Sequence, residues 1–74
     1  MDENLRQEKL IMWKANLVQL EEDLKAILAK KGAAAQEGDL SENAAYTMAI
    51  EDADTTRVRI NEVKKIIAEL EKGK

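Results

Sequence analysis

Two stripes of mostly apolar residues, one in each half of the chain, constrain the fold more than any other feature of the sequence. Within each stripe the residues recur at alternating spacings of three and four, as in the a/d seam of a coiled coil, and the pattern persists for about four heptads. The first stripe consists of Leu10, Trp13, Leu17, Leu20, Leu24, Ile27, Lys31 and Ala34, and the second of Tyr46, Ala49, Ala53, Thr56, Ile60, Val63, Ile67 and Leu70.

The two stripes are mirror images of each other along the chain. Pairing them from the outside inward joins position 10 with 70, 13 with 67, 17 with 63 and 20 with 60, and then 24 with 56, 27 with 53, 31 with 49 and 34 with 46; each pair sums to 80. A continuous helix or a parallel pair would need no such symmetry. The stripes therefore predict an all-α fold, a two-helix antiparallel coiled-coil hairpin that turns near residue 40.

Composition agrees with long helices and excludes several classes of protein. The chain has 74 residues and no Pro, so it has room for one small domain and not for a multilayered enzyme with a pocket. The absence of Cys and His excludes disulfides, the usual zinc sites and nucleophiles activated by His. No apolar run is long enough for a membrane span and no signal peptide is evident, so a cytoplasmic protein is expected.

The turn carries its own signals. Gly38 is suited to end the first helix in a left-handed conformation, and Asp39 can cap the second helix with Glu42 completing a capping box; Ser41 is an alternative cap. The expected boundaries are helix one over about 3–36, a tip over 37–43 and helix two over about 40–72.

The charges are unevenly distributed along the chain. Residues 32–56 contain six acids and no base, a charge of −6, so the net charge of −3 leaves +3 for the remainder. The hairpin should therefore be negative at its tip, and this charge should direct its association with partners toward cationic sites.

Several apolar residues fall outside the seam. Leu5, Ile11, Met12 and Val18 lie mostly on the opposite side of helix one, with Val58 and Ile66 as similar extras on helix two. They are either ordinary scattered surface residues or a docking face for a second copy or another domain. Because a two-helix hairpin with one seam is only marginally stable, we favour a docking face and predict self-association, with a homodimer as the expected form.

The segment from Gly38 to Tyr46 reads Gly-Asp-Leu-Ser-Glu-Asn-Ala-Ala-Tyr. It resembles the tip signature of the Gre transcript-cleavage factors, GreA and GreB, which reads Gly-Asp-Leu-x-Glu-Asn-Ala-x-Tyr at the turn of an antiparallel coiled-coil hairpin. All seven defined positions agree, and they lie where the seam symmetry independently places a turn. The resemblance extends over nearly the whole chain as the N-terminal domain of that family.

The resemblance implies a function. Gre factors insert their hairpin into the secondary channel of bacterial RNA polymerase and stimulate the polymerase's own cleavage of backtracked RNA, so the chain would not itself be an enzyme. By position, Asp39 and Glu42 would share the second catalytic Mg²⁺ with the polymerase, and the chain would have no cofactor of its own. Gly38, Leu40, Ser41, Asn43 and Tyr46 would support the tip. On spacing alone, Asp39 and Glu42 fit plain helix capping better than metal binding; the signature match and the run of six acids without a base reverse that preference, and one residue can serve both roles.

The sequence also departs from the family. The family's FKBP-like second domain is not present in this sequence, and Ala35 and Ile50 stand where Gre factors commonly carry Arg residues that contact RNA. Contact with the RNA 3′ end is therefore in question. Two alternatives remain open: a hairpin that blocks the channel or competes with Gre factors, and a purely structural coiled-coil module.

Overall fold

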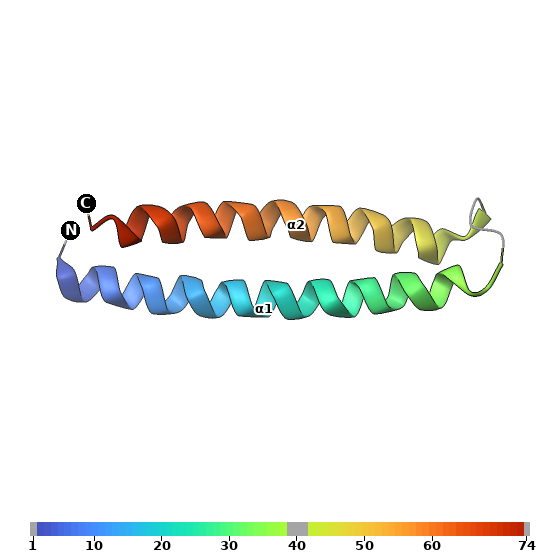
Figure 1. Cartoon of the computed structure of the whole chain (residues 1–74), viewed down its shortest axis with the longest axis horizontal. Helices are drawn as coiled ribbons and strands as arrows, with labels where there is room; N and C mark the ends of the chain where they lie inside the picture. Colours follow the sequence, from blue (N-terminus) through green and yellow to red (C-terminus); the bar gives the residue numbers. More distant parts are fainter. Residues whose placement is uncertain (1, 39–41, 74) are drawn as a thin grey trace.

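The protein is a hairpin of two long helices. The computed structural model describes residues 2–38 and 42–73, with helix α1 over Glu3–Ala35 and helix α2 over Ala44–Glu71. The helices run antiparallel, both termini lie at one end, and the turn lies at the other (Figure 1). The Cα trace measures 55 × 14 × 12 Å. The predicted all-α, two-helix antiparallel hairpin is confirmed.

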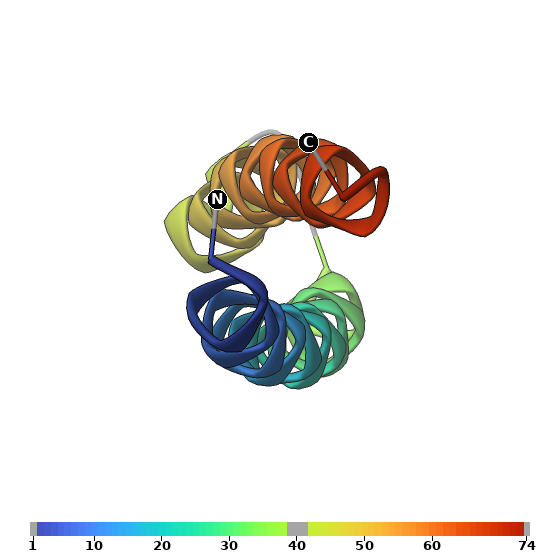
Figure 2. The same cartoon turned by 90° about the vertical axis from the view of Figure 1, so that its left-hand side faces the viewer.

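The predicted seam holds the two helices together. Every residue of both stripes is buried or half-buried, and the most deeply buried are Leu10, Ala34, Ala49, Ala53, Thr56, Ile60, Val63 and Ile67. Figure 2, which looks along the rod, shows α1 and α2 displaced in opposite directions from one end to the other, so the helices wind around each other. Such winding keeps a seam with a repeat of 3.5 residues facing its partner.

The seam changes in size along the rod. In the terminal half, near the two chain ends, Leu10, Val63 and Ile67 form a buried cluster, against which Trp13, Leu17, Leu20 and Leu70 pack. In the tip half, the buried positions are the small residues Ala34, Ala49 and Ala53, followed by Thr56. Since hydrophobic stabilisation follows the apolar area removed from water, most of it lies in the terminal half.

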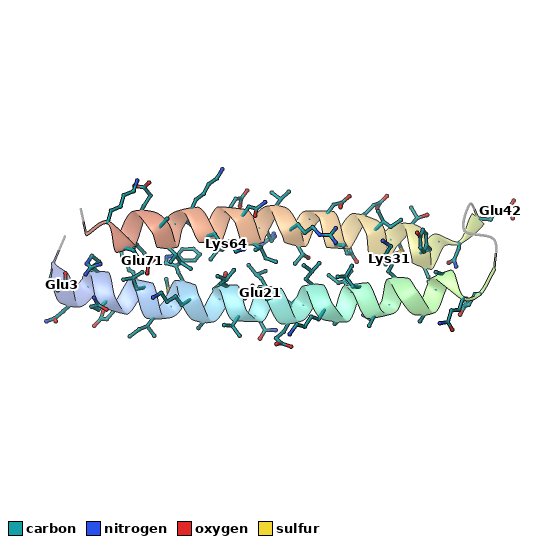
Figure 3. All side chains as sticks on the ribbon, viewed as in Figure 1. Glu3, Glu21, Lys31, Glu42, Lys64 and Glu71 are labelled. Carbon is teal, nitrogen blue, oxygen red and sulfur yellow. The ribbon has the colours of Figure 1, made fainter. Side chains whose placement is uncertain are left out.

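Polar contacts close the terminal end. The Asp2 carboxylate caps α1, because Oδ1 accepts a hydrogen bond from the Asn4 backbone N–H at 3.1 Å. The Arg6 guanidinium donates from Nη1 to the Leu70 carbonyl at 2.8 Å and pairs with Glu3 on its own helix. Lys14 and Glu71 add an exposed ion pair at 3.5 Å between the helices. Glu3 and Glu71 both lie at this end in Figure 3.

The start of α2 differs from the prediction. Its N-cap is Asn43, so the expected capping box of Asp39 and Glu42, and the alternative cap at Ser41, are wrong. The helix begins at Ala44, four residues after position 40. The physical reason is that Asn43 can both cap α2 and bond to α1. Asp39, Leu40 and Ser41 lie outside the described residues.

Neither helix in the part of the chain that the structure describes is long and apolar enough to cross a lipid bilayer.

Candidate functional site

The candidate site is the turn at the end of the rod that lies away from both termini (Figure 1). Helix α1 stops with two turn-type hydrogen bonds, from the Gln36 N–H to the Ala33 carbonyl at 3.3 Å and from the Glu37 N–H to the Ala34 carbonyl at 3.1 Å. Gly38 then has a φ of +114°. This positive φ agrees with the role expected of Gly38, although the residue is the second after the C-cap Gln36 and not the first.

Asn43 connects the two helices at the tip. Its Oδ1 accepts a hydrogen bond from the Tyr46 backbone N–H at 3.1 Å and so caps α2. Its Nδ2 donates to the carbonyl of Ala34, near the end of α1, at 2.8 Å. One half-buried side chain therefore fixes where α2 begins and how close that point lies to α1. We refer to this pair of bonds as the Asn43 clamp.

Glu42 is the tip carboxylate whose position the structure describes. It directly precedes the Asn43 clamp and is exposed. In Figure 3 it lies at the extreme end of the rod, beyond α2. A carboxylate held there by a fixed helix start is available to a positively charged group approaching the tip from outside. Its predicted partner Asp39 lies outside the described residues, so the geometry of that pair stays a prediction.

Tyr46 packs at the tip, as its seam position predicts. The ring is half-buried, and the ammonium nitrogen of Lys31 lies 5.9 Å from its centroid, within the range of a cation–π contact. Sequence reasoning did not single out Lys31, although the signal was present: a charged residue at a seam position, close to the layer that holds the aromatic ring. Figure 3 shows Lys31 between the ribbons near the tip.

Small seam residues leave an open groove beside the tip. This tip groove has a volume of about 450 Å³ and is lined by Ile27, Lys30, Ala33, Ala34, Glu37, Ala45, Met48, Ala49 and Asp52. Two acids and one base border it. Among residues 2–38 and 42–73, no group of three or more acidic side chains is arranged to hold a metal ion.

The predicted docking-face residues lie away from the tip. Leu5, Ile11, Met12 and Val18 are all exposed, with Ile11 at 69% and Val18 at 59%. On a helix, residues seven apart lie on the same side, which places Ile11 with Val18 and Leu5 with Met12 in two strips. A partner for these strips stays a prediction.

The two positions at which Gre factors commonly carry Arg differ from each other in exposure. Ala35 is the exposed last residue of α1, and Ile50 is half-buried on α2. Neither side chain can hold a phosphate by charge. The nearest bases on α1 are Lys30, beside the tip groove, and Lys31, which covers Tyr46.

Comparison with known proteins agrees with this architecture. A family model described as "Transcription elongation factor, N-terminal", for the GreA and GreB proteins, matches residues 5–71, which include all but the first two residues of α1, the turn and all of α2. No curated protein and no solved structure matches the chain. Because the family model spans nearly all of the sequence, the chain belongs to the family of the N-terminal domain of GreA/GreB transcription elongation factors.

Proposed function

We propose that this hairpin enters the secondary channel of bacterial RNA polymerase and stimulates cleavage of backtracked RNA by the polymerase's own active site. The observation that carries the proposal is the position of the Gre signature. It spans Gly38 to Tyr46, which comprises most of the connection between α1 and α2 and the first residues of α2, at one end of the rod.

The shape and the tip support this proposal. The rod is only two helices wide and its Cα trace is 55 Å long, a slender and extended shape that suits insertion into a channel. Glu42 lies exposed at the leading end, where a polymerase group can reach it. The Asn43 clamp fixes the backbone on which Glu42 is carried.

Two tip carboxylates are too few to hold a Mg²⁺ ion by themselves, but they suit an ion whose other ligands come from the polymerase. Mg²⁺ prefers oxygen ligands and is commonly held by one or two protein carboxylates together with other groups. Asp39 and Glu42 would supply those oxygens, and the polymerase would supply the rest. The second ion would complete a two-metal site, in which the two ions together stabilise the attacking and leaving oxygens of phosphoryl transfer. The chain's own contribution is to add negative charge at the tip and to keep it in place.

The test is a stalled, backtracked elongation complex in which RNA shortening is followed with and without the protein. We expect faster shortening with the wild type, and a large loss of that effect in Asp39→Asn and in Glu42→Gln. Glu69→Gln is the matched control, because Glu69 is an exposed acid near the opposite end of the rod. Equal stimulation by wild type and both tip variants would refute the role of the carboxylates.

A second candidate function is blockade of the same channel. It is favoured by Ala35 and Ile50, which remove the two cations that Gre factors commonly place near the RNA. In that case the protein slows nucleotide addition and competes with cleavage-competent Gre factors, and no RNA shortening accompanies the inhibition. The same assay separates the two functions.

A further inference from the structure

A groove on one side of the rod, about midway along it, differs in charge from two other grooves of the structure. This middle groove has a volume of about 410 Å³ and is lined by Glu21, Leu24, Lys25, Leu28, Arg57, Ile60, Asn61 and Lys64. Figure 3 shows Glu21 on α1 and Lys64 on α2 near the middle of the rod. Both helices contribute to it, so its shape depends on the hairpin and not on one helix alone.

The middle groove is cationic in an acidic protein. Three bases and one acid line it, so the lining side chains carry a net +2; Glu22 and Asp54, which pair with Lys25 and Arg57, lie outside the lining. The tip groove has one base and two acids. A third groove, nearer the termini, has Arg59 balanced by Glu62. A local excess of positive charge favours a negatively charged occupant.

The bases of the middle groove form only weak ion pairs within the protein. Lys25 lies 3.7 Å from Glu22, and Arg57 lies 3.4 Å from Asp54, each on its own helix and each exposed. Exposed ion pairs of this kind contribute little to stability, so the cost of exchanging them for a partner's carboxylates is small.

The middle of the groove is apolar. Ile60 is buried and Leu24 is half-buried, while Leu28, which lies outside the seam, remains 37% exposed. Leu28 therefore offers surface that the hairpin itself does not cover. An occupant must combine an apolar side chain, seated on Leu28, with acidic groups that reach the surrounding bases.

From this combination we propose that the middle groove binds an acidic amphipathic segment of a protein partner. The inference rests on the proposed function for the identity of that partner, which is RNA polymerase. Bound nucleic acid is a poorer fit, since single strands are usually held by stacking on aromatic rings, and neither Trp13 nor Tyr46 lines this groove. Docking at the middle of the rod holds the hairpin in the channel without involving the tip.

The first experiment compares Lys64→Glu with Lys65→Glu. The two lysines are adjacent, both are exposed, and both substitutions change the net charge equally, but only Lys64 lines the groove. Binding of the labelled protein to purified core RNA polymerase is measured by fluorescence anisotropy. We expect Lys64→Glu to weaken binding about tenfold and Lys65→Glu to change it less than about twofold. Equal affinities for the two variants would overturn the proposal.

Two further measurements identify the occupant. A photo-crosslinking amino acid at Leu28 should react with a polymerase segment that contains acidic and apolar residues; attachment to RNA or to a basic segment would overturn the proposal. A labelled single-stranded RNA serves as the second probe. If wild-type protein binds this RNA and Lys64→Glu does not, the groove is a nucleic-acid site and the proposal fails.

The design keeps the two proposals apart. Glu42→Gln should bind core polymerase like the wild type and lose only its effect on cleavage. Failure of the wild type to bind polymerase would refute the proposed function. Binding by the wild type that Lys64→Glu leaves unchanged would refute the groove alone.

Discussion

The Asn43 clamp makes the tip more sensitive to one side chain than its exposed setting suggests. Replacing Asn43 by Ala removes the cap on α2 and the bond to the Ala34 carbonyl together. Loss of an N-cap costs about 1 kcal/mol, and loss of a hydrogen bond costs about the same. The Ala34 carbonyl still accepts from the Glu37 N–H, so no buried acceptor is left without a partner.

The expected total for Asn43→Ala is therefore about 2 kcal/mol of unfolding free energy. For a domain of this size, that corresponds to a fall in Tm of roughly 8–16 °C. Asn43→Asp separates the two contributions, because its carboxylate still accepts from Tyr46 but no longer donates to Ala34. We expect this variant to lose about 1 kcal/mol near neutral pH. Protonation of the carboxyl at low pH restores a donor and should recover part of the loss.

The measurement is urea and thermal unfolding followed by circular dichroism, at one fixed protein concentration. Asn61→Ala is the control, since Asn61 is exposed inside α2 and caps nothing; its change should stay within about 0.5 kcal/mol. The reasoning is refuted if Asn43→Ala behaves like this control, or if Asn43→Asp is as unstable as Asn43→Ala.

Three further predictions follow from the structure. Hydrogen bonds, first from Arg6 and then from Gln7, lower the pKa of Glu3 from its ordinary 4.5 to about 2. The ionised Glu3 therefore stabilises the folded state above about pH 4.5, and this stabilisation is lost as the pH falls toward 2. A carboxyl-carbon NMR titration of the folded protein measures this pKa. Gly38→Ala should destabilise the hairpin by about 1 kcal/mol in urea unfolding, because its φ of +114° strains any other residue while an added Cβ would meet nothing within 4 Å; an unchanged midpoint would contradict this. Self-association through the exposed apolar residues should appear as a dimer in sedimentation at high micromolar concentration and be lost in Ile11→Glu; a monomeric wild type would contradict it.

The seam could be predicted from the sequence because the buried positions of a packed helix recur with the helical repeat. Alternating spacings of three and four identify the inner face of each half, and the mirror symmetry between the halves fixes their pairing. Among residues 2–38 and 42–73, every buried residue belongs to the predicted stripes. Even Lys31, an unusual seam residue, is only half-buried, with its ammonium group over Tyr46.

The start of α2 could not be predicted in the same way. Asp39, Ser41 and Asn43 are all good capping residues, and local preference does not decide among them. The choice depends on a contact made across the turn, from Asn43 to the end of α1, which only the folded hairpin contains. The relation between Asp39 and Glu42 stays a prediction, because Asp39 lies outside the described residues.

The unequal seam has a consequence for how the chain folds. The contacts that bury most apolar area join Leu10 to Val63 and Ile67, which are far apart in the sequence, whereas the contacts nearest the turn involve alanines. Pairing of the two helices that starts at the turn therefore begins with weak contacts between small side chains. The conformational entropy lost in bringing distant parts of the chain together is offset only when the large residues near the two chain ends come into contact. We expect a transition state in which much of the rod is already paired, and a slower folding rate than the helical content alone suggests.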